Sequence, residues 1–108
     1  MRPRALKRVI EAVQARPEHP YTATELAQIA QLSPRRLQET FREHLGLSPM
    51  AYVRQVRLER VHRELQQAGP GEAGVGDVAR RWGFTHLGRF AAEYKARYGR
   101  SPSYTLTH

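Results

Sequence analysis

The stretch from Leu26 to Leu47, LAQIAQLSPRRLQETFREHLGL, constrains the fold of this chain most, because it predicts two short helices around a tight turn. Thr22 and Glu25 stand in the T-x-x-E arrangement of a capping box at the start of the first helix. In such a box the hydroxyl accepts a hydrogen bond from an exposed amide, and the carboxylate reaches back to the cap residue. The pattern predicts a helix-turn-helix.

The second helix of this pattern is predicted to begin at Pro34. Ser33 is suited to cap its first turn, Pro34 has no N–H to leave unsatisfied there, and Gly46 permits a left-handed stop. Apolar residues recur every four positions along the helix, which predicts one buried face. The apolar residues are Leu37, Phe41 and Leu45, and the opposite face carries Arg35, Arg36, Gln38, Glu39, Arg42 and Glu43.

The exposed face of this second helix has two interpretations. Guanidinium and amide groups in its amino-terminal half are donors that hydrogen-bond base edges in a DNA major groove, which would make it a recognition helix. Arginine and glutamine are also good surface residues of ordinary helices, so the face can equally be solvated only. The base-reading candidates are Arg35, Arg36, Gln38 and Glu39, and Arg42 is a candidate for a backbone phosphate.

The same pattern occurs twice in the chain. When Leu26-Ala27 is placed on Val78-Ala79, the cap and core positions coincide, and one additional residue in the second turn keeps the remainder in register. A repeat of about fifty residues that preserves core, stop and cap positions together predicts two copies of one module. The matched pairs are Thr22 with Gly74, Ala27 with Ala79, Leu32 with Phe84, Leu37 with Phe90, Phe41 with Tyr94, Gly46 with Gly99, and Ser48-Pro49 with Ser101-Pro102.

Two runs of the sequence resemble a known family of bacterial regulators. The run from Gly83 to Leu106, GFTHLGRFAAEYKARYGRSPSYTL, is similar to the second helix-turn-helix signature of AraC/XylS-type transcription regulators, with Gly-Phe, a later aromatic residue, a basic helix and Gly-x-x-Pro. The run LSPRRLQETFREHLGLSPMAYVRQVRLERV is similar to their first helix-turn-helix and the helix that follows it. The resemblance covers nearly the whole chain and implies a tandem helix-turn-helix DNA-binding domain.

The resemblance also implies partners. Such regulators are usually activators that meet RNA polymerase at a promoter, although nothing in the residues distinguishes activation from repression. Many of them join a domain of this kind to an amino-terminal sensing and dimerisation domain, for which 108 residues leave no room. The chain is therefore expected to be a stand-alone monomeric regulator or the carboxy-terminal piece of a longer protein, acting in the bacterial cytoplasm at the nucleoid.

By the same resemblance, the base-reading positions of the second module fall on Leu87, Gly88, Arg89 and Ala92. Leu87 can touch a thymine methyl group and Arg89 can read a guanine, whereas glycine and alanine offer no hydrogen-bonding side chain. The first module is therefore predicted to carry most of the sequence discrimination, and the second to add affinity. Phosphate contacts are expected at the Thr22 and Gly74 caps and at Arg42, Arg80, Arg81, Arg89 and Lys95.

The charge of the chain is consistent with a nucleic-acid partner. It has 18 Lys plus Arg against 10 Asp plus Glu, a formal net charge of +8, which suits a DNA binder, a ribosomal protein or a protein on an anionic membrane.

The start of the chain, MRPRALKRVIEAVQARP, predicts a basic amphipathic helix that either covers the first module or lies on an anionic membrane. No apolar run approaches the roughly 20 residues of a membrane span, and without cysteine the chain has neither disulfides nor thiolate zinc sites.

The longest predicted helix, Pro49 to Ala68, is expected to bridge the modules. Its apolar residues fall on two sides about 150° apart, which fits two cores better than one wide stripe. The two sets are Tyr52, Val53 and Val56, and Leu58, Val61, Leu65 and Ala68. At about 1.5 Å per residue the helix spans roughly 30 Å, close to the roughly 34 Å of one DNA turn. The glycine-rich segment 69–76 after it, GPGEAGVG, is predicted to be a mobile linker.

Together these patterns predict an all-α fold of about seven helices, with helix-turn-helix subdomains at 1–47 and 69–108 and the bridging helix at 48–68. The predicted function is sequence-specific binding of double-stranded DNA in successive major grooves, with Trp82 and Phe84 in the core rather than stacked on bases. The alternatives are a non-specific architectural DNA binder and a helical protein-interaction module. No enzymatic activity, cofactor or metal is expected, because the 5 His residues lack local ligand spacing.

Overall fold

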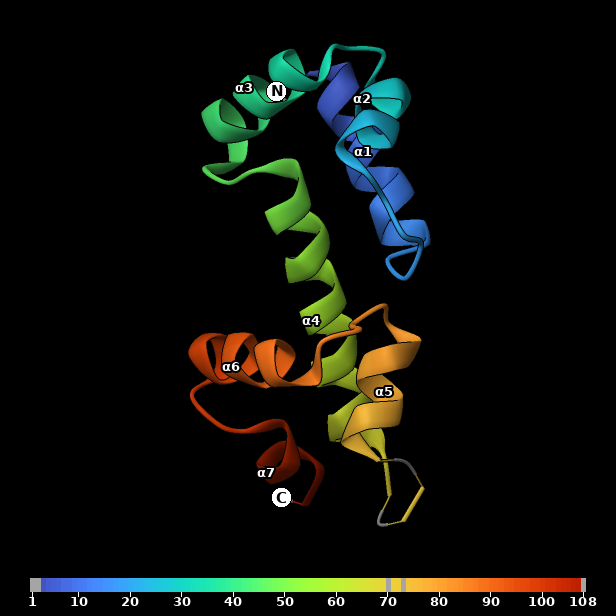
Figure 1. Ribbon diagram of the computed structural model, residues 1–108, viewed down its shortest axis with the longest axis vertical. Coiled ribbons are helices and arrows are strands. Elements are labelled where there is room, and N and C mark those ends of the chain that lie inside the picture. The colour runs from blue at the N-terminus through green and yellow to red at the C-terminus, as the bar shows by residue number, and fades with distance from the viewer. Residues whose placement is uncertain (1–2, 70, 73, 108) are drawn as a thin grey trace. The chain divides into compact units, whose positions relative to one another are not determined.

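Seven helices make up the regular structure of the part of the chain that the computed structural model describes, residues 3–69, 71–72 and 74–107. They are α1 (Arg4–Ala15), α2 (Ala23–Ala30), α3 (Pro34–Leu45), α4 (Pro49–Gln67), α5 (Val75–Arg81), α6 (Leu87–Tyr98) and α7 (Pro102–Thr107) (Figure 1). The all-α prediction is confirmed, and none of the described helices is long and apolar enough to cross a membrane. Of the predicted mobile linker, residues 70 and 73 lie outside the described residues.

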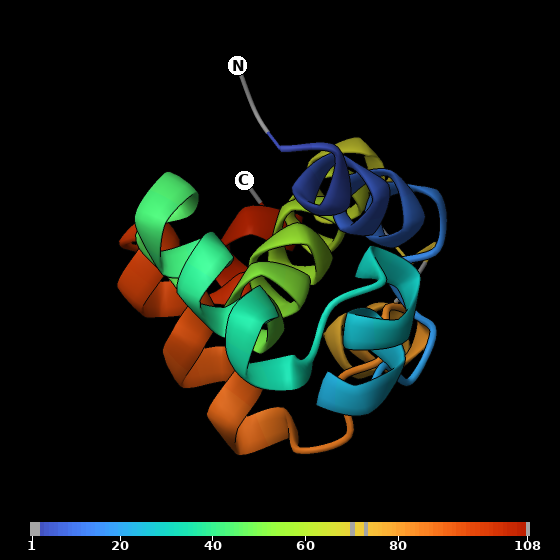
Figure 2. The same ribbon diagram turned by 90° about the horizontal axis from the view of Figure 1, so that it is seen from above.

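The first compact unit packs α1, α2 and α3 with the amino-terminal half of α4. Each helix contributes an apolar stripe to one core, as amphipathic helices do. Figure 2 shows α1 and α2 side by side, with α3 following α2 after a short turn. The most deeply buried side chains of this core include Leu6, Val9 and Val13 of α1, Leu26 of α2, Leu37 and Phe41 of α3, and Val53 of α4.

The second compact unit is built from the carboxy-terminal half of α4 with α5, α6 and the short α7. Its core is more aromatic than the first: the ring centroids of Phe84 and Phe90 lie 4.8 Å apart, and those of Phe90 and Tyr94 lie 5.9 Å apart. Phe84 therefore fills the core, as predicted, and Trp82 packs half-buried against the same cluster. The aliphatic residues of this core are Leu58, Val61, Leu65 and Val78.

Helix α4 contributes to both cores, as its sequence predicted. The first core contains Tyr52, Val53 and Val56, and the second contains Leu58, Val61 and Leu65. The boundary between the two compact units falls inside the helix, between Val56 and Arg57. The two apolar faces of α4 therefore pack in two separate cores. Each half of the helix is buried on its own side, although no single apolar stripe runs along its whole length.

The turns of the two helix-turn-helix motifs share one backbone geometry. Gln31 and Gly83 occupy equivalent positions, and both have positive φ, 60° and 96°. In each turn the following residue donates its N–H, at 3.0 Å, to the carbonyl of the residue five positions earlier. The donor and acceptor are Leu32 and Ala27 in the first turn, and Phe84 and Ala79 in the second. The second turn is therefore marked by a glycine, whereas the first places a glutamine in the left-handed region.

Replacing Gly83 with alanine should destabilise the second unit by about 1–2 kcal/mol, the usual cost of an L-residue in the left-handed region. The added Cβ would also lie 3.0 Å from Cζ of Arg57. Gln31→Gly is the matched change in the first unit. It should alter the free energy of unfolding by less than about 1 kcal/mol, because relief of the left-handed strain is offset by the freedom of unfolded glycine. Thermal unfolding measures both, and equal losses would contradict the shared turn geometry.

The caps of the second helix in each motif also correspond. Ser33 Oγ accepts the Arg36 N–H at 3.1 Å, and at the equivalent position His86 Nδ1 accepts the Arg89 N–H at 3.0 Å. Both helices end at glycines with φ of 73°, and serines cap the next helices. These residues are Gly46 and Gly99, and Ser48 and Ser101. The serine cap and glycine stop of α3 are confirmed, and the histidine cap of α6 is an addition that the sequence did not predict.

The capping box predicted for α2 forms only in part. Thr22 Oγ1 accepts the Glu25 N–H at 3.1 Å, as expected. The Glu25 carboxylate was expected to reach back to the Thr22 amide, but it instead lies 2.5 Å from Nε2 of His19. His19 packs edge-on against Tyr21, with ring centroids 4.7 Å apart. The reciprocal half of the box was wrongly predicted because the segment before α2 supplies the carboxylate with another hydrogen-bond partner.

The repeat extends further toward the amino terminus than the sequence indicated. In the first unit α1 takes the role that the carboxy-terminal half of α4 takes in the second. The buried residues Leu6, Val9 and Val13 correspond, at the same spacing and register, to Leu58, Val61 and Leu65. Each unit is therefore one helix, then a helix-turn-helix, then the start of a closing helix.

Candidate nucleic-acid interface

Helix α3 presents a polar face opposite the first core. Its inward residues Leu37, Thr40 and Phe41 are buried, and Thr40 Oγ1 donates to the Arg36 carbonyl at 2.9 Å. The side chains of Arg35 and Arg36 are 92% and 66% exposed. The structure exposes all five residues that the sequence assigned to this face as DNA contacts: Arg35, Arg36, Gln38, Glu39 and Arg42. The face therefore places exposed hydrogen-bonding groups on a helix that is fixed from behind.

Glu39 lies within reach of both arginines of this face. Its carboxylate oxygens are 3.4 Å from Nε of Arg35 and 3.6 Å from Nη1 of Arg36. Ion pairs between exposed side chains are worth only about 0–1 kcal/mol, so a base edge or a phosphate can displace the carboxylate. Guanidinium groups suit guanine, the Gln38 amide suits adenine, and a carboxylate suits the amino group of cytosine.

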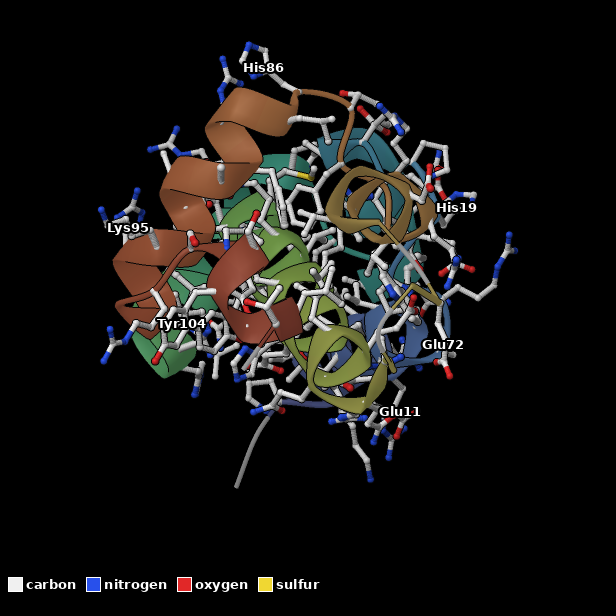
Figure 3. The ribbon with its side chains drawn as sticks, turned by 90° about the horizontal axis from the view of Figure 1, so that it is seen from below. Glu11, His19, Glu72, His86, Lys95 and Tyr104 are labelled. Carbon is white, nitrogen blue, oxygen red and sulfur yellow. The ribbon has the colours of Figure 1, made fainter. Side chains whose placement is uncertain are left out.

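Helix α6 presents the equivalent face of the second unit with far fewer hydrogen-bonding groups. The α6 residues at the positions of Arg35, Arg36, Gln38, Glu39 and Arg42 are all exposed, and they are Gly88, Arg89, Ala91, Ala92 and Lys95. Figure 3 shows the side chains of His86 and Lys95 projecting outward along this helix. Two cationic side chains, Arg89 and Lys95, are therefore the groups of this face that can hold bases or phosphates.

Leu87, a predicted base-reading residue of the second module, is half-buried and packs against the second core. Its Cδ1 lies 3.4 Å from the position that a Cβ on Gly76 of α5 would take. The exposed face of α6 thus begins at Gly88, and a thymine contact from Leu87 stays a prediction.

The two arginines of α5 that were predicted as phosphate contacts already have carboxylate partners. Arg80 Nη1 lies 3.4 Å from Asp77 Oδ1 at the surface. Arg81 Nη1 donates to one oxygen of Glu64, whose other oxygen accepts the Trp82 Nε1–H at 3.0 Å. The Glu64 side chain is only 25% exposed, so its pair with Arg81 is better shielded from water. Arg81 therefore ties α5 to α4, and its contact with phosphate stays a prediction.

Alanine substitutions distinguish Arg81 from Lys95. Arg81→Ala should lower the stability of the second unit by about 1–3 kcal/mol, because it leaves the half-buried Glu64 carboxylate without its charged partner. Lys95→Ala should change stability by less than about 0.5 kcal/mol but reduce the salt dependence of duplex binding by about 0.9 in slope. Urea unfolding and anisotropy titrations measure the two effects. If Arg81→Ala changed the slope and left stability unaltered, Arg81 would be a phosphate contact instead.

Two further candidates for phosphate contact are helix amino termini. Thr22 caps α2 through its side chain, and Gly74 precedes α5 with its backbone alone. Both residues are exposed. The first N–H groups of a helix carry partial positive charge and suit an anionic oxygen. Their geometry is compatible with phosphate contact, which stays a prediction.

The chain has two helix-turn-helix units, and each exposes one face of its second helix. This arrangement is typical of the class of double-stranded DNA-binding proteins. The formal net charge of +8 matches that partner. A sequence profile of the helix-turn-helix domain matches residues 26–108. The chain belongs to the AraC/XylS-type family of such domains, which bind DNA in transcription regulators.

Two similar proteins are named as regulators of operons. The chain is 36% identical over 104 residues to the probable thc operon regulatory protein of Rhodococcus erythropolis, covering 96% of this chain and 31% of that protein. It is 36% identical over 101 residues to XylDLEGF operon transcriptional activator 2 of Pseudomonas putida, covering 94% of this chain and 64% of that protein. The chain thus spans about a third of the first relative and less than two thirds of the second.

Solved structures share the fold. A probable AraC family transcriptional regulator from Rhodopseudomonas palustris matches with a TM-score of 0.90 and 33% identity, covering 97% of this chain and 96% of that one. The DNA-binding domain of AdpA, solved in complex with a target DNA, matches with a TM-score of 0.84 over 95% of this chain and 90% of that one. Its identity is 22%, so this second likeness concerns the fold alone.

Proposed function

We propose that this domain binds double-stranded DNA sequence-specifically, with α3 and α6 entering successive major grooves. The observation that carries the proposal is the exposed face of α3, where hydrogen-bonding side chains stand on a helix anchored by the buried Leu37 and Phe41. Base edges are read only when the backbone holds the reading side chains in register with the groove. An anchored helix with an exposed polar face meets that requirement.

The residues of the two faces have distinct roles in this proposal. Arg35 and Arg36 read O6 and N7 of guanines, Gln38 reads N6 and N7 of an adenine, and Glu39 accepts from N4 of a cytosine. In the second unit Arg89 reads a guanine, while the small residues of the α6 face add no hydrogen bond. The first unit therefore carries the sharper half of the binding site, and the second adds affinity.

Phosphate contacts position the domain on the duplex without reading sequence. In the proposal they come from exposed cations on both units and from the amino termini of α2 and α5. Arg81 can join them only by exchanging the Glu64 carboxylate for a phosphate. The remaining contributors are Thr22, Arg42, Gly74, Arg80 and Lys95.

We also propose that DNA binding by this domain activates transcription through contact with RNA polymerase at a promoter. Support comes from the similar Pseudomonas putida protein, whose name describes an operon transcriptional activator. The matched region makes up 31% of the Rhodococcus erythropolis relative. A sensing or dimerisation domain that works together with the DNA-binding domain is therefore part of the proposal.

The affinity for duplex DNA should fall steeply with salt. With about six phosphates neutralised, the slope of log K against log salt is about −5, and affinity falls about a thousandfold between 50 and 200 mM. Anisotropy titrations with the preferred duplex and a scrambled duplex measure the slope and the specificity. The preferred duplex should bind at least about a thousandfold tighter. Equal affinities would indicate an architectural binder, and no binding at physiological salt would indicate a protein-interaction module.

A further inference from the structure

A groove in the second unit lies outside the face assigned to DNA. Its volume is about 470 Å³, and its lining residues are His62, Gln66, Tyr98, Arg100, Tyr104 and Thr105. Figure 3 shows Tyr104 on α7, whereas Lys95 projects from α6 and His86 from the cap position just before it. The proposed base contacts lie in the first turns of α6, and the groove begins at its last residue, Tyr98. An occupant of this groove therefore leaves the start of α6 available to DNA.

The floor of the groove is a fixed aromatic surface. The rings of His62 and Tyr98 are stacked, with centroids 3.8 Å apart and planes 6° from parallel. His62 Nδ1 lies 2.6 Å from the Tyr94 hydroxyl, which in turn donates to Thr105 Oγ1 at 2.8 Å. Since Tyr94 is fully buried, these bonds hold the stacked pair to the core. Both rings are half-buried and line the groove, so their accessible parts offer apolar surface to a partner.

The rim of the groove is cationic and aromatic. The Arg100 guanidinium lies 4.6 Å from the centre of the Tyr104 ring, which is 39% exposed. Burial, and secondarily the charge of Arg97, lowers the pKa of His62 below its usual value of 6.5, so this imidazole is neutral at neutral pH. Arg97 itself pairs with Glu59 at 2.9 Å. Among the residues that line the groove, Arg100 is therefore the one that carries a positive charge at neutral pH.

The first unit contains the equivalent groove with a different lining, which provides an internal comparison. Its volume is about 410 Å³. When the two repeats are aligned, five lining residues of the first groove occupy the positions of lining residues of the second. The aligned pairs are Ile10 with His62, Gln14 with Gln66, Leu45 with Tyr98, Leu47 with Arg100, and Tyr52 with Thr105. The fold is thus built with aliphatic residues at the positions of the histidine, tyrosine and arginine. His62 has a structural role, because it bonds the buried hydroxyl of Tyr94, which stands where the first core has Phe41, and Tyr98 stacks on it. Arg100, which stands where the first groove has Leu47, has no such role in the core and points to a partner.

We propose that the groove of the second unit binds an acidic segment of a partner protein. A carboxylate of that segment pairs with Arg100, and an apolar side chain packs on Tyr104 and on the stacked rings of His62 and Tyr98. Arginine holds a carboxylate by two parallel hydrogen bonds, and the Gln66 amide offers a donor and an acceptor to a peptide backbone. The proposal does not depend on how the domain reads DNA.

The openness of the groove favours a protein segment over a small ligand. Gln66, Arg100 and Tyr104 are exposed on its rim. Sites for small molecules bury about 70–90% of the ligand, which an open groove does not achieve. A protein segment brings its own surface to exclude water around the contact, and arginine and tyrosine are enriched where such contacts are strongest.

An NMR titration of the whole domain, free and bound to duplex DNA, tests the proposal. The probe is a capped heptapeptide in which Asp alternates with Leu and Phe, and a matched peptide carries Asn in place of Asp. The acidic peptide should give saturable shifts at the lining residues in both states. Arg100→Ala and the Asn peptide should each weaken binding at least about tenfold. Arg63→Ala, which removes an exposed arginine of α4 outside the groove, should leave it within about twofold.

Three outcomes would overturn the proposal. Absence of saturable shifts with the acidic peptide would show that the groove does not bind such a segment. Shifts spread equally over the basic faces of α3 and α6 would show that the peptide is attracted by the overall charge of the domain and not by the groove. Phenylacetate binding at least as tightly as the peptide would make the groove a small-molecule site. Arg100→Ala should bind DNA as the unaltered domain does, so failure here and failure of the proposed DNA recognition are distinguishable.

Discussion

Replacing Arg35 and Arg36 together with alanine should weaken binding to the preferred duplex at least about thirtyfold, because each bidentate guanine contact is worth about 1–3 kcal/mol. The two side chains are 92% and 66% exposed, so their removal leaves the core of the first unit intact. Affinity for a scrambled duplex should fall far less, since only charge is lost there. Competition binding between the two duplexes measures the change in specificity, with circular dichroism as the check on folding.

Arg89→Ala is the matched control for the loss of specificity caused by alanine in α3, because Arg89 occupies in α6 the position that Arg36 occupies in α3. Both residues follow the cap of their helix by the same number of positions, as the bonds of their N–H groups to Ser33 and His86 show. Arg89→Ala should cost less specificity than Arg36→Ala alone. A larger loss from Arg89→Ala would contradict the division of labour between the units.

Phe41→Ala should lower the free energy of unfolding of the first unit by about 3–5 kcal/mol, the usual cost of removing a buried aromatic ring. The Phe41 side chain is 0% exposed and lies 5.8 Å from the Tyr52 ring. Because small domains are stable by only about 5–15 kcal/mol, the first unit should melt at a much lower temperature. Far-ultraviolet circular dichroism follows the loss of helix.

Trp82 reports separately on the second unit, because it is the chain's 1 tryptophan and packs against the second core. Its fluorescence transition should shift little in Phe41→Ala. It should shift strongly in Tyr94→Ala, which empties the equivalent position of the second core. Coincident loss of helix and of the tryptophan signal in Phe41→Ala would show that the two cores unfold as one.

The features of the fold that were predictable are those with a local physical cause. Ser33 and Pro34 mark a helix start and Gly46 a helix stop wherever they stand in a chain, and the spacing of the apolar residues of α4 places them in two cores. The left-handed Gln31 was not predictable, because non-glycine residues adopt that conformation only when the surrounding structure imposes it. The contact between His19 and Glu25 depends in the same way on how the segment before α2 folds back.

The candidate interface likewise has features that the sequence predicts and features that only the packed structure shows. Exposure of Arg35 and Gln38 follows from helical periodicity, and the structure agrees. Arg81 and Glu64 lie on consecutive helices and are 17 positions apart. Because their pairing depends on how α5 packs against α4, only the packed structure shows that this arginine already has a partner. The alignment of the two repeats places His86 at the position of Ser33 and could therefore have indicated the cap of α6. Histidine, however, is not a usual cap residue.

Selection of bound duplexes from a random library at near-physiological salt, followed by sequencing, tests the central claim most directly. The proposal predicts an asymmetric site with two elements about one helical turn apart, roughly 10 base pairs. The sharper element should disappear when Arg35 and Arg36 are both replaced by alanine. Equal information in the two elements would contradict the division of labour, and no enrichment of any sequence would contradict sequence-specific recognition by this domain.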